Sequence, residues 1–122
     1  MSDPNFILLY VDHPENSGRF YADLLGKAPV ESSPTFVLFA LESGFMLGLW
    51  SKHTVEPPAT PVGGSEVAFS LADNVAVDAL YRDWLARGIP MQQTPTAMEF
   101  GYTFVALDPD RHRLRVFAPA VE

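Results

Sequence analysis

The sequence predicts an α+β protein made of two similar halves, each with a strand, a helix and then further strands. Apolar β-rich runs alternate with two segments whose apolar residues recur at helical spacing. The halves overlay when the numbering is shifted by 60, so that Phe6 falls on Glu66 and Tyr21 on Tyr81. Agreement in element order, length and helix phase indicates an internal duplication.

The first half begins with an apolar run, Phe6 to Val11, that predicts a strand. A helix is expected next, with Pro14 as its first residue and Gly26 as its C-terminal cap. Its apolar stripe consists of Phe20, Tyr21, Leu24 and Leu25. Two short β-rich runs, Thr35 to Leu41 and Phe45 to Trp50, complete a βαββ pattern.

The second half follows the same plan. Glu66 to Leu71 is strand-like, and Asn74 to Arg87 is helix-like with Asp73 or Asn74 as its N-cap. Met91 to Thr94 is expected as a short edge strand. Two further strands, Tyr102 to Leu107 and Leu114 to Phe117, flank the turn Asp108-Pro109-Asp110-Arg111.

A length of 122 residues fits one domain, spanning 1–122. We expect the first module to occupy 1–51 and the second 65–122. The segment between them, 52–64, is rich in proline and glycine, which predicts an exposed connector.

Composition excludes several classes of function. A formal net charge of -7 without a Lys/Arg cluster argues against a nucleic-acid partner. The lack of cysteine excludes thiolate-bound metals and cysteine nucleophiles. The first residues, Met1 to Asn5, lack the basic run of a signal peptide, and no apolar run approaches the roughly 20 residues of a membrane span. We therefore expect a cytoplasmic protein without a membrane partner.

Side-chain alternation divides each strand into two faces. One face is uniformly apolar, as with Val11 and Leu49, and is expected to pack on the helices. The other face is mixed, with Phe6, Tyr10, Met46, Trp50 and Phe117 beside Glu66 and Arg115. Aromatic surface with a few charged groups is typical of a small-molecule site, so we expect two curled sheets to form a cleft from their mixed faces.

Trp50 is expected to stack on a planar ligand, since Gly48 beside it would leave room for a flat group. The alternative is that Trp50 fills the core of a dimer. Glu66 and Arg115 are expected on opposite walls of the cleft, either as a structural ion pair or as ligand contacts, and a third interpretation makes Glu66 a general base. In the second case Glu66 would bind an amine or hydroxyl and Arg115 a carboxylate. The three histidines are dispersed in the sequence and are expected at the surface: His13, His53 and His112.

Several motifs resemble those of the vicinal oxygen chelate superfamily, which includes glyoxalase I, extradiol dioxygenases and bleomycin-resistance proteins. In the first half these motifs are Tyr10-Val11, Ser17, Phe20-Tyr21 and Leu24-Leu25-Gly26. In the second half they are Ala68-Phe69, Leu71, Asp73, Phe100-Gly101 and Asp108-Pro109-Asp110. The resemblance implies two βαβββ modules that form a cupped mixed sheet, with the helices on its outer face.

Metal-dependent members of that superfamily place His, Gln or Glu at inward positions. Here the matching positions are Phe6, Glu66 and Arg115, with Gly48 or Trp50 at the end of the first module. Only Glu66 is a potential ligand, whereas a divalent metal in an enzyme takes about three. The sequence is therefore more similar to the metal-free branch of phenazine- and bleomycin-resistance proteins.

This branch implies a homodimer that sequesters a small, largely planar aromatic toxin or antibiotic with no metal, cofactor or catalytic residue. Two alternatives remain open. One is a metal-dependent lyase or isomerase of the glyoxalase type. The other is a paralogue whose cleft has closed and binds nothing.

Overall fold

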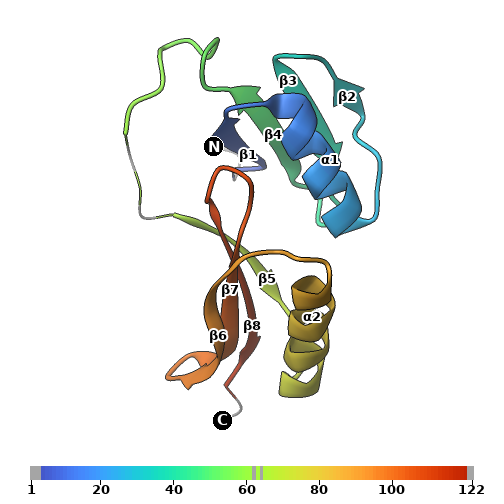
Figure 1. Ribbon diagram of the computed structural model, residues 1–122, viewed down its shortest axis with the longest axis vertical. Helices are drawn as coiled ribbons and strands as arrows, with labels where there is room; N and C mark the ends of the chain where they lie inside the picture. Colours follow the sequence, from blue (N-terminus) through green and yellow to red (C-terminus); the bar gives the residue numbers. More distant parts are fainter. Residues whose placement is uncertain (1–3, 62, 64, 121–122) are drawn as a thin grey trace. The chain divides into compact units, whose positions relative to one another are not determined.

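The computed structural model describes residues 4–61, 63 and 65–120. It divides into two compact units, residues 1–62 and 63–122, each with one helix and a four-stranded mixed sheet (Figure 1). The predicted α+β class and the two βαβββ modules are confirmed. Met1 to Asp3, and residues 62 and 64 of the expected connector, lie outside the described residues.

Unit 1 has the sheet order β1-β4-β3-β2. Its elements are β1 (Phe6–Val11), α1 (Pro14–Leu25), β2 (Glu31–Ser32), β3 (Phe36–Ala40) and β4 (Met46–Ser51). β1 and β4 run parallel, and the other pairs are antiparallel. As predicted, Pro14 opens the helix and Gly26 closes it in the left-handed conformation, with φ 67°. The short strand β2 was not predicted, because its two exposed residues carry no apolar pattern.

Unit 2 repeats this topology with the order β5-β8-β7-β6. Its elements are β5 (Glu66–Ser70), α2 (Asn74–Ala86), β6 (Met91–Met98), β7 (Gly101–Leu107) and β8 (Arg113–Pro119). Asp73 is the N-cap, since its Oδ1 accepts a hydrogen bond from the Ala76 amide at 2.8 Å. β6 extends beyond the expected Thr94, where its polar run and two register shifts obscure the alternation.

The apolar strand faces pack on the helices, as the alternation predicts. Val11, Leu49, Leu114 and Val116 are fully buried, whereas Phe6 on the mixed face of β1 is 53% exposed. α1 contacts β3 and β4, and α2 contacts β6, β7 and β8. One face of each sheet is therefore covered by a helix, and the candidate residues lie on the other face. Among the described residues, neither helix is long and apolar enough to cross a membrane.

Candidate functional site

An apolar pocket of about 420 Å³ lies on the mixed face of unit 1. Phe6 and Leu8 line it from β1, Phe36 from β3 and Trp50 from β4. The Phe36 and Trp50 rings meet edge to face, with centroids 6.0 Å apart. A pocket of this volume is large enough for a small organic ligand, and its lining favours an apolar, aromatic one.

The space above Gly48 is already filled. A Cβ atom at this position would lie 2.6 Å from Leu8 Cδ2 and 3.0 Å from Phe36 Cζ. The expectation that Gly48 leaves room for a ligand is therefore wrong, because the side chains of Leu8 and Phe36 occupy that room. Gly48 instead allows these two side chains to lie close to the sheet.

Two other predicted residues lie beside the pocket rather than in its lining. In the strand register Tyr10 pairs with Trp50, and Met46 pairs with Phe6. Tyr10 is 43% exposed on the same face. Strand alternation had placed Leu8 on this face without selecting it as a candidate. The phase of Phe36 was ambiguous, because every residue of β3 is apolar.

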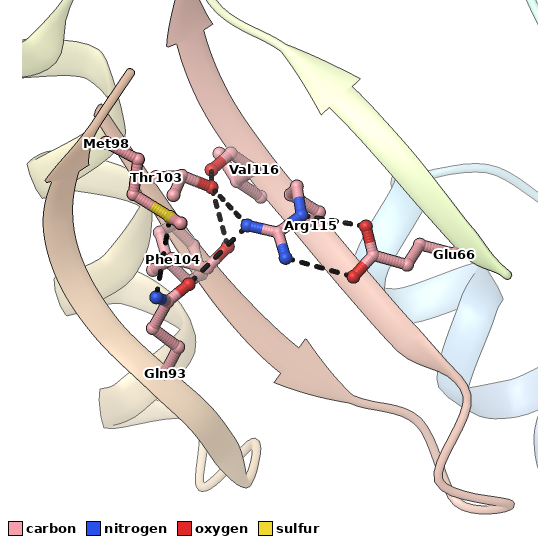
Figure 2. Close-up of polar contacts among 7 residues, drawn as sticks. All are labelled: Glu66, Gln93, Met98, Thr103, Phe104, Arg115 and Val116. Atoms are coloured by element: carbon pink, nitrogen blue, oxygen red, sulfur yellow. Dashed lines mark hydrogen bonds and ion pairs between the residues drawn. The ribbon is translucent and has the colours of Figure 1, made fainter. Parts of the chain in front are cut away.

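The mixed face of unit 2 is polar and centres on an ion pair (Figure 2). Arg115 donates from Nε to Glu66 Oε1 at 2.7 Å and from Nη2 to Glu66 Oε2 at 3.0 Å. This bidentate contact is the geometry in which guanidinium binds carboxylate most strongly. It lowers the pKa of Glu66, chiefly through the hydrogen bond from Arg115. The ion pair was one expected alternative, but its residues occupy one face of neighbouring strands in one sheet, not opposite walls.

The third guanidinium nitrogen of Arg115 also donates hydrogen bonds within the protein. Nη1 contacts Thr103 Oγ1 at 3.2 Å and Gln93 Oε1 at 3.5 Å (Figure 2). Thr103 donates in turn to the Val116 carbonyl at 2.8 Å. Sequence reasoning missed Gln93 and Thr103. Thr103 lies two residues from Val105, which faces Arg115 across the β7–β8 register, so alternation extended along β7 would have found it.

One aromatic ring borders this ion pair, and a second ring packs against the first. The Arg115 guanidinium carbon lies 5.7 Å from the centroid of the Phe100 ring, within the range of a cation–π contact. Phe100 also meets Phe117 edge to face at 5.9 Å. Phe117 therefore lies with Arg115 on the mixed face, as alternation predicted. This face thus combines a charge-compensated polar centre with aromatic surface.

The structure brings together two histidines that are far apart in sequence. His13 Nε2 lies 3.1 Å from Asp12 Oδ2, and His53 Nε2 bonds Asp12 Oδ1. The hydrogen bond with His53 is the main cause that lowers the pKa of Asp12. These side chains are exposed, as expected for His13 and His53. Within residues 4–61, 63 and 65–120, no three His, Asp or Glu side chains form a group able to hold a metal ion.

A family model and a curated relative both relate this chain to the same superfamily. The model of the glyoxalase/bleomycin resistance protein/dioxygenase superfamily matches residues 4–116. The phenazine antibiotic resistance protein EhpR of Enterobacter agglomerans is 34% identical over 116 residues, which are 93% of this chain and 89% of that protein.

Solved structures extend the comparison to the fold. The solution NMR structure of a protein from Agrobacterium tumefaciens is 56% identical, has a TM-score of 0.90, and covers 99% of this chain and 100% of its own. The crystal structure of a glyoxalase-related enzyme from Fulvimarina pelagi is 23% identical and has a TM-score of 0.83. It covers 97% of this chain and 88% of its own, and its likeness concerns the fold alone.

Proposed function

This chain belongs to the glyoxalase/bleomycin resistance protein/dioxygenase superfamily, and from that premise we propose that it binds and sequesters a small, largely planar aromatic toxin or antibiotic. Its relation to a phenazine antibiotic resistance protein supports resistance through binding. The pocket of Phe6, Leu8, Phe36 and Trp50 is the observation that carries the proposal. A ring stacked on Trp50 would gain roughly 0.5 to 1.5 kcal/mol beyond its buried area.

The proposal includes capture without a metal, a cofactor or turnover. Three of the four positions that match metal ligands in the resembling enzymes carry Phe6, Arg115 and either Gly48 or Trp50, and none of these residues is a metal ligand. The fourth, Glu66, already accepts two hydrogen bonds from Arg115. A cation bound there would have to displace or face a guanidinium group. The donor set therefore supports binding over metal-dependent catalysis.

Fluorescence titration tests the proposal, because the chain has two tryptophans in different environments. Trp50 lines the pocket, whereas Trp84 is 3% exposed and packs against Phe69 and Phe104. Phenazine is expected to quench the wild-type emission, and Trp50→Ala is expected to lose both the quenching and most of the affinity measured by calorimetry. Unchanged affinity in Trp50→Ala, with Trp84 emission showing a folded protein, would contradict the stacking role.

The rival function is a metal-dependent lyase or isomerase of the glyoxalase type, which superfamily membership alone favours. Metal analysis of the purified protein separates the two functions. We expect no stoichiometric divalent ion and unchanged phenazine affinity after treatment with a chelator. One retained metal per chain whose removal abolishes binding would favour the enzyme.

The proposed assembly is a homodimer in the cytoplasm. Phe6, Leu8 and Tyr10 together expose a large apolar area on β1, and such surface is often covered in an assembly. Light scattering coupled to size exclusion is expected to give twice the chain mass of 13.5 kDa. Elution as a monomer at all concentrations would remove this part of the proposal.

A further inference from the structure

We infer that Leu8 determines the specificity of the unit 1 pocket: by filling the hollow above Gly48, it restricts the pocket to flat ring systems. This inference rests on the proposed function and names the shape of ligand that the site accepts. It follows from the close approach of Leu8 to Gly48 and from a comparison with the corresponding pair of residues in unit 2.

Leu8 and Gly48 face each other across the parallel strands β1 and β4. The Leu8 Cδ2 atom lies where a side chain at residue 48 would begin, 2.6 Å from the Cβ position. Leu8 nevertheless remains 44% exposed and lines the pocket. One part of its side chain therefore covers the sheet at Gly48 while another part forms the pocket wall.

In unit 2 the large and the small residue of the corresponding pair lie on exchanged strands. The corresponding register pair on β5 and β8 is Ala68 and Arg115. In this pair the first strand carries the small residue and the last strand the large one, the reverse of Leu8 and Gly48. Each pair thus joins one small and one large residue. In unit 2 the large residue is charged, whereas in unit 1 it is apolar.

The ligand class follows from the lining of the pocket. Three of its four lining side chains are aromatic, and Leu8 contributes only methyl and methylene groups. With the Gly48 hollow filled, we expect a flat aromatic ring to lie against the lining, whereas a ring with substituents above and below its plane would meet Leu8. Truncation of Leu8 would reopen the hollow and admit such a ring.

The test compares two three-ring probes, flat acridine and 9,9-dimethyl-9,10-dihydroacridine, whose methyl groups leave the ring plane. We expect the wild type to prefer acridine by about tenfold, as one or two misplaced methyl groups usually cost, and Leu8→Ala to abolish most of that preference. The matched control is Leu85→Ala, since Leu85 is 51% exposed on α2 of the other unit. It should leave the preference unchanged.

A double-mutant cycle tests the mechanism independently. Gly48→Ala should weaken acridine binding in the wild type, because the new Cβ pushes Leu8 into the pocket. In the Leu8→Ala background the same change should have a much smaller effect. If the wild type and Leu8→Ala both bind acridine and share the same preference, the inference about Leu8 is wrong while the proposed function stands. If no variant binds either probe although circular dichroism shows native folding, both the inference and the proposed function fail.

Discussion

Arg115 holds both carboxylate oxygens of Glu66 across the neighbouring parallel strands β8 and β5. Its side chain is 20% exposed and that of Glu66 is 28% exposed, so the pair is partly shielded from water. The charge of the guanidinium is therefore compensated within the protein. Four predictions concern this ion pair and the hairpin beside it.

Removal of the carboxylate charge should destabilise the protein. We expect Glu66→Gln to lower the free energy of unfolding by about 1 to 2 kcal/mol, because a charge-assisted hydrogen bond is lost and partial exposure moderates the cost. Urea denaturation measures this change. Adding Arg115→Met should cost less in the Glu66→Gln background than in the wild type, and strictly additive effects would show that the pair is not coupled.

The same pair predicts a dependence of stability on pH. The pKa of Glu66 is lowered in the folded state, so folding gains stability above the unfolded pKa and loses it as the pH falls through the folded pKa. The loss on acidification from about pH 5 to pH 3 should be larger for the wild type than for Glu66→Gln. Urea denaturation across this range checks it, and parallel pH curves for the two proteins would refute it.

The preference for an anionic over a neutral ligand should also change in Glu66→Gln. Because Glu66 occupies both carboxylate-binding nitrogens of Arg115, we expect the unit 2 face of the wild type to bind phenazine-1-carboxylate no more tightly than phenazine-1-carboxamide. Glu66→Gln leaves the guanidinium charge uncompensated and should shift the preference toward the carboxylate by about tenfold. Calorimetry with both compounds provides the measurement. A strong carboxylate preference in the wild type would mean that Arg115 is available to ligand anions despite Glu66.

Gly101 should tolerate no side chain. Its φ is 152°, and a Cβ atom would lie 2.0 Å from the Ala118 carbonyl oxygen, which belongs to the backbone and cannot move aside. Gly101→Ala should therefore disturb the pairing of β7 with β8 and destabilise the protein by about 3 kcal/mol or more. Gly44→Ala is the matched control, since Gly44 also has a positive φ of 96° but has no atom within 4 Å of its Cβ position. Thermal unfolding should show a clearly smaller loss for the control.

Strand alternation predicted which residues share the mixed face, because side-chain direction in a strand is a local property. It correctly grouped Phe6 with Trp50 and Glu66 with Arg115. It failed where the local pattern is weak. In β3 every residue is apolar, so Phe36 had no assigned phase, and the register shifts in β6 hid Gln93.

Periodicity and local motifs were enough to predict a duplicated plan of strand, helix and further strands, the strand faces that pack on the helices, and the family that the motifs resemble. These properties depend on periodicity and on residues that are neighbours along one strand or helix. The contact of Leu8 with Gly48 and the ion pair of Arg115 and Glu66 within one sheet became apparent only in the folded structure. Such contacts depend on strand order, register and side-chain reach, which arise only when segments about 40 or 50 residues apart in the chain pair with each other.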